Sequence, residues 1–185
     1  MAFTYIVRCN FSEPAREQAW NDWYNGPKLV QMLAKPMFRT VQRFRRVAGA
    51  GRDYVALWTI DSPKAFETEE YTSDWGFFEW RPYIIDWSRD LFEGAPADDR
   101  LPIDRDGALT IVSFDGLSAE AAEAGRRDVD ASTPGFSWFP SAGLDRHTPL
   151  IGLRTGEADA PAGAGQRVVY RPISAFHRAE QRQAT

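Results

Sequence analysis

Two stretches decide the fold: FTYIVRC at Phe3–Cys9 and LTIVSF at Leu109–Phe114. Both predict strands, and in the first one apolar side chains alternate onto both faces, which is typical of a strand buried on both sides. A serine follows each strand, Ser12 in one case and Ser118 in the other, where it can cap the start of a helix. Each helix leads through a proline-containing turn to a second strand, so the sequence predicts a β-α-β-β unit written twice.

The first half of the chain predicts the element order β-α-β-β-α-β. Its first helix is expected from Ser12 to about Asn25, because Gly26-Pro27 should break or kink it before a second helical turn. Like the first strand, Tyr54–Ile60 is apolar on both faces, and in a ferredoxin-like sheet these two strands are the central ones. The remaining expected elements are a basic strand typical of a sheet edge at Met37–Val47, a short helix after Ser62-Pro63, an irregular aromatic region at 71–80 and a strand at Tyr83–Phe92.

Four segments are predicted along the chain. Residues 1–93 form a ferredoxin-like α+β unit, and residues 94–107, which are charged and contain two prolines, form a linker. Residues 108–178 form a second, reduced ferredoxin-like unit, in which a mobile loop at 156–165 stands where the first unit has its second helix. Residues 179–185 form a polar tail. A tandem duplication explains this order, and so does a single α+β domain with extra C-terminal strands.

Composition excludes several classes of protein. A formal charge of −4 argues against nucleic acid as a partner, and the single cysteine, Cys9, excludes an intrachain disulfide. No apolar run reaches the ~18 residues that a membrane-spanning helix needs, and the N-terminus does not resemble a signal peptide. We therefore expect a cytoplasmic protein with no membrane partner. No zinc-ligand spacing or phosphate-binding loop is present in the sequence, and we expect neither a metal nor a cofactor.

Aromatic residues make up 14% of the chain, with seven tryptophans, which indicates either a large core or a pocket for flat, apolar ligands. Three of these aromatic residues, Trp20, Trp23 and Tyr24, fall on one face of the first predicted helix. Four more lie on strands that are predicted to be adjacent: Tyr5, Tyr54, Trp58 and Trp87. Whether these side chains pack as core or stack on a small-molecule ligand depends on which sheet face they occupy.

The segments WNDWYN, at 20–25, and LVQMLAKPMFRTVQRF, at 29–44, resemble the EthD-like branch of the dimeric α+β-barrel superfamily. Two later segments, Tyr54–Ile60 and Asp86–Arg89, fit as well, so the resemblance covers about residues 1–93. It implies a ferredoxin-like fold, antiparallel sheets that meet as a barrel, and a pocket between sheet and helices. Members include isomerases, lyases, cofactor-free oxygenases and proteins without an assigned activity. The chain departs from the pattern at Pro27, where the usual histidine is missing, and at Met37, which replaces the usual glycine.

Without that histidine, the candidate acid/base groups are Asp22, Asp86, His147 and His177. An imidazole titrates near neutral pH, and a carboxylate buried among apolar groups has a raised pKa, so each residue type suits proton transfer. Three of the four also have a structural interpretation: His147 and His177 lie at a turn and a strand end, and Asp86 could pair with a strand arginine.

Arginines also alternate on one face of the basic strand, at Arg39, Arg43 and Arg45. Arg43 could clamp an anionic ligand, since guanidinium groups hold carboxylates through two hydrogen bonds, or the row could be a solvated sheet edge.

Three functions remain open. The first is an enzyme that performs metal-free proton transfer, as an isomerase, dehydratase or related lyase, on a small apolar or aromatic metabolite. The second is a cofactor-free oxygenase, and the third is a non-catalytic protein that binds a hydrophobic metabolite. In each case we expect a homodimer, because even a duplicated sheet would leave an exposed edge.

Overall fold

The computed structural model describes residues 2–96, 101–159, 163 and 165–180. The first half has the elements β1 (Phe3–Phe11), α1 (Glu17–Trp23), α2 (Leu29–Leu33), β2 (Phe38–Gly49), β3 (Tyr54–Ile60), α3 (Glu69–Thr72) and β4 (Ile84–Glu93). The second half has β5 (Leu109–Ser113), α4 (Ala119–Ser132), β6 (Ser137–Leu144), β7 (Leu150–Thr155), β8 (Gln166–Pro172) and β9 (His177–Arg178). The predicted α+β class and the order of elements are confirmed.

The strands form one antiparallel sheet that closes into a barrel within this single chain. The strand order is β3-β1-β4-β6-β7-β5-β8-β2-β9, and β2 also pairs with β3. Each half therefore has the same internal order, β2-β3-β1-β4 in the first and β6-β7-β5-β8 in the second, and the halves join through the pairs β4–β6 and β8–β2. The expectation that β1 and β3 are the central strands of the first half is confirmed.

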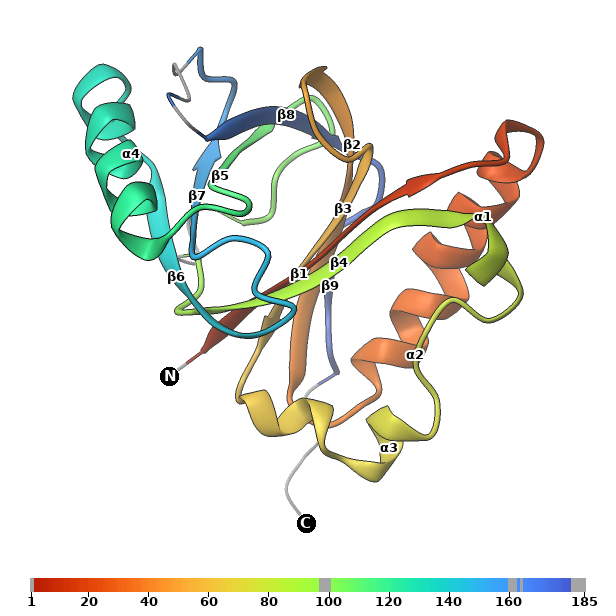
Figure 1. Cartoon of the computed structure of the whole chain (residues 1–185). Coiled ribbons are helices and arrows are strands. Elements are labelled where there is room, and N and C mark those ends of the chain that lie inside the picture. The colour runs from red at the N-terminus through yellow and green to blue at the C-terminus, as the bar shows by residue number, and fades with distance from the viewer. Residues whose placement is uncertain (1, 97–100, 160–162, 164, 181–185) are drawn as a thin grey trace.

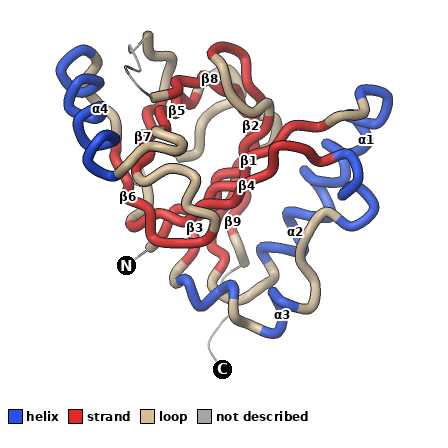
Figure 2. The backbone as a smooth tube through the Cα atoms, viewed as in Figure 1, coloured by secondary structure: helices blue, strands red, loops and turns tan. Residues whose placement is uncertain are grey.

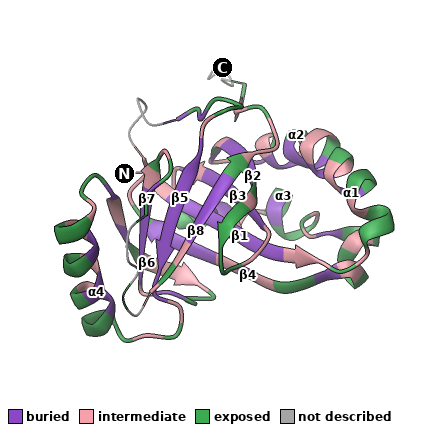
Figure 3. Cartoon of the chain, turned by 90° about the horizontal axis from the view of Figure 1, so that it is seen from above, coloured by how far each residue is buried: buried purple, intermediate pink, exposed green. Residues whose placement is uncertain are grey.

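Helices cover the barrel on two sides, with α1, α2 and α3 against the first half and α4 against the second (Figures 1 and 2). Side chains from both halves fill the barrel interior, among them Ile6, Phe44, Phe92, Ile111 and Tyr170. A separate aromatic cluster lies between the first half of the sheet and its helices, and a smaller one lies under α4. Figure 3 shows the buried strands passing between these two helical layers.

Strand β2 is not a sheet edge, as its basic sequence had suggested. It pairs with β3 on one side and with β8 and β9 on the other. Its charges are accommodated because carboxylates from neighbouring elements meet them, in the ion pairs Arg39–Asp61, Arg45–Glu17 and Arg46–Asp53. Since β1 to β8 all pair on both sides among the described residues, the sheet-edge argument for a homodimer does not hold.

The first helix differs from its prediction at both ends. Ser12 does not cap it, because the Ser12 hydroxyl donates instead to the carbonyl oxygen of Tyr83 at 3.1 Å. Gly26-Pro27 does not end it either: the chain continues from α1 to α2 through a π-helical turn at Tyr24–Lys28. Proline has no N–H group to donate, so a locally widened turn carries it without breaking the helical path.

The second half agrees more closely with its prediction. Ser118 caps α4 by accepting a hydrogen bond from the backbone N–H of Ala121 at 3.1 Å. The turns before β2 and β6 share a left-handed residue, Met37 with φ 68° and Gly135 with φ 103°, which explains why glycine suits this position.

The charged segment before β5 packs against the barrel. Leu101 and Ile103 join the interior cluster, and the Gln42 side chain bonds both the N–H and the carbonyl of Ile103. Residues 97–100 of the predicted linker lie outside the described residues, as do 160–162 and 164 of the predicted mobile loop and 181–185 of the tail. The described part of that loop forms no helix.

Candidate aromatic pocket

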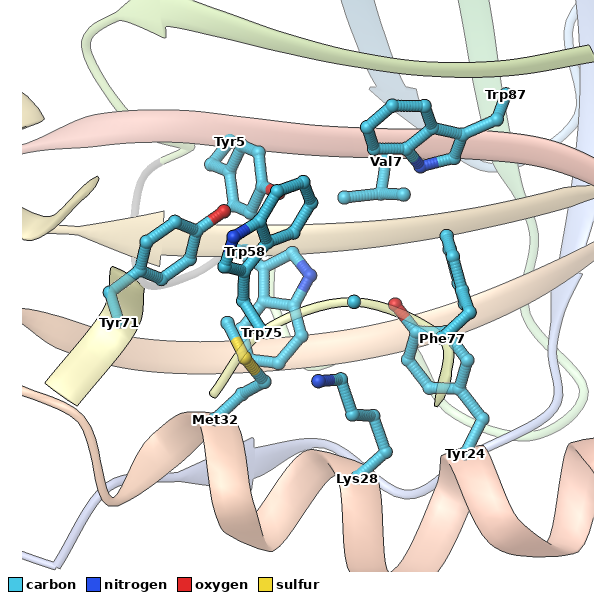
Figure 4. Close-up of a pocket in the computed structure, with 11 residues that line it drawn as sticks. Tyr5, Val7, Tyr24, Lys28, Met32, Trp58, Tyr71, Trp75, Phe77 and Trp87 are labelled. Carbon is cyan, nitrogen blue, oxygen red and sulfur yellow. The ribbon is translucent and has the colours of Figure 1, made fainter. Parts of the chain in front are cut away.

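A pocket lies between the outer face of the first half of the sheet and its helical layer (Figure 4). We call it the aromatic pocket; it is lined by Tyr5, Val7, Tyr24, Lys28, Met32, Trp58, Tyr71, Trp75, Gly76, Phe77 and Trp87. Its cavity volume is about 30 Å³, within about 370 Å³ of space that includes its open mouth. A water molecule needs about 10–15 Å³ by the same measure, so the pocket in this conformation holds only about two waters.

The π-helical turn decides which side chains of the helix enter the pocket. Figure 4 shows Met32, Lys28 and Tyr24 extending from the helix toward the strands that carry Tyr5, Val7 and Trp58. Lys28 is only 5% exposed although its side chain ends in an amine. π-Helical turns occur often at functional sites, and here the turn at Tyr24–Lys28 brings its first and last residues to one cavity.

Lys28 is the titratable group of the pocket whose pKa falls toward neutrality. Its pKa is lowered to about 8, chiefly by burial and also by the nearby cation of Lys35, while Asp74 opposes the change. The Lys28 amine donates to Gln31 Oε1 at 3.0 Å, and Gln31 in turn donates to Asp74 at 2.5 Å. A fraction of the amine is therefore uncharged near pH 8 and can accept a proton.

Some of the other polar groups around the pocket are N–H groups without a hydrogen-bond acceptor. The indole N–H groups of Trp58 and Trp87 are buried and have no hydrogen-bond partner among the described residues. Nε of Arg89 has none either, although it lies 4.0 Å from Asp145 Oδ1 in an ion pair. No aspartate or glutamate is among the lining residues. A buried donor without an acceptor costs free energy, about 1–3 kcal/mol each, so this arrangement suits a ligand that brings acceptor oxygens.

Tyr5 and Tyr71 lie at the far side of the pocket. Arg89 Nη1 donates to the Tyr71 hydroxyl at 3.1 Å. The pKa of Tyr5 is raised well above its ordinary value by burial, and the neighbouring Tyr71 and Tyr24 raise it further. The Tyr5 hydroxyl is thus a donor at neutral pH and does not act as a base.

Arg43 lies behind the pocket and does not line it. Its guanidinium donates to Asn25 Oδ1 at 2.7 Å and Asn21 Oδ1 at 3.1 Å, and its central carbon lies 3.9 Å from the Tyr24 ring centre. Burial lowers its pKa to about 10, so it stays charged at neutral pH. Arg43 therefore supports the helix and the Tyr24 ring, and it is not placed to clamp a ligand in the aromatic pocket.

Solved structures show the same architecture. An anthrone oxidase-like protein has a TM-score of 0.62 at 10% identity, covering 100% of this chain and 96% of its own. A "putative monooxygenase" from Fusobacterium nucleatum has a TM-score of 0.58 at 6% identity, covering 100% and 98%. A mutant chlorite dismutase from Candidatus Nitrospira defluvii has a TM-score of 0.50 at 9% identity, covering 92% of each chain.

This chain has the dimeric α+β-barrel fold. At identities of 10% or less, the fold is what the comparison establishes. No family model and no curated protein matches the sequence.

Half of the eight ligand-binding residues predicted from the sequence line the aromatic pocket. Tyr5, Tyr24, Trp58 and Trp87 do so. The others lie behind it: Trp20 stacks on Phe11, Trp23 packs edge-on against Tyr24, Tyr54 contacts the Arg43 guanidinium, and Arg43 itself is buried.

The structure does not bring the four predicted acid/base residues to the pocket. Asp22 is exposed and accepts a hydrogen bond from Gln18 at 2.8 Å. Asp86 is exposed, with φ 50°, and accepts one from Asn10, so it is not a carboxylate buried among apolar groups. His147 is exposed in a turn, where its backbone N–H donates to the buried Asp90 at 2.7 Å. His177 lies in β9, paired with Val41 of β2.

Sequence reasoning missed Lys28, Tyr71, Trp75 and Phe77. Lys28 is four residues after Tyr24 on the same helical path, a spacing that would have placed it on the Tyr24 face had the helix been continued through Pro27. The aromatic residues of 71–77 carry no periodic pattern, so their place over the pocket could not be predicted from the sequence.

No helix among the described residues is long and apolar enough to cross a membrane.

Proposed function

We propose that this chain is a small-molecule enzyme that removes a proton from a flat aromatic substrate carrying an acceptor oxygen, such as a phenol or an enolisable aryl ketone. Lys28 is the base. The observation that carries this proposal is the combination, in one aromatic cavity, of an amine with its pKa lowered to about 8 and two indole N–H groups without hydrogen-bond partners, those of Trp58 and Trp87. The proposal replaces the carboxylates and imidazoles expected from the sequence with a lysine.

The chemistry follows from the charges of the two partners. The neutral Lys28 amine accepts the proton of the O–H or of the carbon next to the carbonyl, and the substrate becomes an anion. The ammonium balances that charge inside the pocket, and the Trp58 and Trp87 N–H groups are free to bond the anionic oxygen. Returning the same proton to another carbon of the substrate completes an isomerisation, which needs no oxidant.

A second candidate is a cofactor-independent oxygenase, which begins with the same step. The fold likeness to an anthrone oxidase-like protein and to a "putative monooxygenase" supports it. For a methylene group between two aryl rings, molecular oxygen would accept four electrons. One oxygen atom would become the carbonyl oxygen, and the other would leave as water with the two methylene protons.

The test compares wild type, Lys28→Met and Lys64→Met with a panel of phenols and aryl ketones in deuterated buffer. Lys64 is an exposed lysine outside the pocket and serves as the matched control. Exchange of a substrate C–H for deuterium, lost in Lys28→Met and kept in Lys64→Met, supports proton abstraction. Oxygen uptake with the same dependence supports the oxygenase. Binding without exchange or uptake contradicts both and indicates a binding protein.

We also propose that the protein is a cytoplasmic homodimer. The dimeric α+β-barrel class of its structural neighbours supports the dimer, although here one chain already closes the barrel and supplies every lining residue of the pocket. Light scattering decides between one and two copies of the 20.9 kDa chain.

A further inference from the structure

Trp75 occupies a slot in the aromatic pocket between two other rings. Its indole stacks on Tyr71, with ring centres 5.8 Å apart and planes 7° from parallel, and on Trp87, at 6.2 Å and 25°. The Arg89 guanidinium carbon lies 4.6 Å from the centre of the Trp75 ring. Rings on both sides and a cation over the face form the environment that binds a flat, electron-rich aromatic molecule.

Trp75 is nevertheless partly exposed and is carried by irregular backbone. It is 40% exposed, one of the large hydrophobic side chains with most surface in solvent. It lies in the segment 73–77 between α3 and the turn that begins at Phe78, where the backbone forms no helix or strand. Partly exposed side chains on irregular backbone exchange more readily with alternative conformations than those of the core.

The segment also has room to move. Gly76 has φ 110°, and a side chain placed there would meet nothing within 4 Å. On the outer side of the segment a groove of about 340 Å³ shares Trp75, Gly76, Phe77 and Trp87 with the aromatic pocket. Figure 4 shows the Trp75 ring between the strand residues and the helix residues of the pocket. Outward movement of Trp75 would join the small cavity to this groove.

We propose that Trp75 is a reversible plug that takes the place of the substrate ring, and that the substrate is a planar fused-ring aromatic of at least indole size. This rests on the proposed function, because the ligand is taken to bind in the same pocket. A cavity of about 30 Å³ cannot admit such a ligand while Trp75 is in place. The substrate therefore enters as Trp75 leaves, and it stacks between Tyr71 and Trp87 over Arg89. The closed protein must open before it binds the substrate. The apparent affinity is therefore the affinity of the open form multiplied by the fraction of molecules that are open.

The test uses 2-naphthol as a flat probe and trans-2-decalol, its saturated and non-planar analogue, as the matched control ligand. Binding to wild type, Trp75→Ala, Trp75→Leu and Ile85→Ala is measured by calorimetry. Ile85 is 45% exposed, on β4, and outside the pocket, so its variant controls for the loss of an exposed apolar side chain. Urea unfolding confirms that each variant folds.

Trp75→Ala is expected to bind 2-naphthol at least about tenfold more tightly than wild type, since stacking contacts of this kind oppose opening. Trp75→Leu, which cannot stack, should also bind more tightly, whereas Ile85→Ala should match wild type. The flat probe should be preferred to trans-2-decalol by at least about tenfold in Trp75→Ala. Unchanged or weaker 2-naphthol binding in both Trp75 variants, or equal binding of the two probes, overturns the plug.

The experiment separates the plug from the function on which it rests. The naphtholate anion absorbs at longer wavelength than 2-naphthol, so absorbance reports proton transfer to Lys28 independently of affinity. Tighter binding in Trp75→Ala without naphtholate supports the plug and contradicts the role of Lys28. Naphtholate formation with unchanged affinity in the variants supports Lys28 and contradicts the plug.

Discussion

Replacing Lys28 by methionine should make the protein more stable at neutral pH while removing its proposed activity. Lys28 is 5% exposed, and burial lowers its pKa from 10.5 to about 8. A shift of that size corresponds to about 3 kcal/mol against the folded state at any pH where the amine is charged in both states. Methionine has a similar length and no charge, so it can fill the same space among Tyr24, Met32 and Phe77.

The sign follows from the protons bound by each state. Between about pH 8 and 10.5 the unfolded chain keeps its Lys28 proton and the folded chain has lost it, so wild-type stability rises with pH across this window. Below pH 8 the full penalty remains. The loss of the hydrogen bond to Gln31 offsets about 1 kcal/mol of the gain in the variant. The net gain of Lys28→Met is therefore about 2 kcal/mol near neutral pH.

The assay is urea unfolding of wild type, Lys28→Met and Lys64→Met at about pH 6.5 and about pH 9.5. The advantage of Lys28→Met over wild type should shrink by about 2 kcal/mol from the lower to the higher pH, because other titrating groups cancel in the difference. Lys64→Met, which changes an exposed lysine, should show no such trend. An advantage that is the same at both pH values would refute the argument that burial depresses the Lys28 pKa.

Four further substitutions test the pocket and the fold. Trp58→Phe and Trp87→Phe each remove an unpaired N–H donor, so each should change the free energy of unfolding by less than about 1 kcal/mol. Each should also weaken naphtholate binding about tenfold, as measured by calorimetry. A large loss of stability with unchanged binding would contradict the assignment of these N–H groups to ligand binding. Arg43→Lys loses the bonds to Asn21 and Asn25 and should destabilise by about 2 kcal/mol in thermal unfolding; a neutral result would show that the guanidinium does not hold the helix. Gly125→Ala should lower the free energy of unfolding, measured in urea, by about 1–3 kcal/mol, because the new Cβ would lie 2.4 Å from the Phe114 ring. The higher helix propensity of alanine acts in the opposite direction. A stabilised variant would mean that α4 can shift away from Phe114.

Local sequence patterns predicted most of the elements but not how they close. The two-sided apolar character of Phe3–Cys9 and Tyr54–Ile60 predicted their central places, and Ser118 marked the start of α4 correctly. The pairs β4–β6 and β8–β2 that close the barrel connect residues far apart in the sequence, and no local pattern encodes them. The row of arginines on β2 suggested an edge because their carboxylate partners come from other elements.

The candidate site was harder to predict than the fold, for a physical reason. Aromatic residues are equally suited to a core and to a pocket, so Trp20 and Trp58 carry the same signal although only Trp58 lines the cavity. The sequence offers carboxylates and imidazoles as acid/base candidates, whereas the pocket residue whose pKa burial lowers toward neutrality is Lys28, a lysine that directly follows a proline. A lysine in sequence is ordinarily a solvated cation with a pKa near 10.4, and only its burial changes that.

The central claim is that the Lys28 amine can lose its proton inside the aromatic pocket near physiological pH. The chain has three lysines, Lys28, Lys35 and Lys64, so the ¹³Cε resonance of each can be assigned by substitution and followed against pH by NMR. We expect a midpoint of about 8 for Lys28, moving upward when 2-naphthol binds and leaves its proton on the amine. A Lys28 midpoint at the ordinary value of about 10.4, unchanged by 2-naphthol, would contradict it.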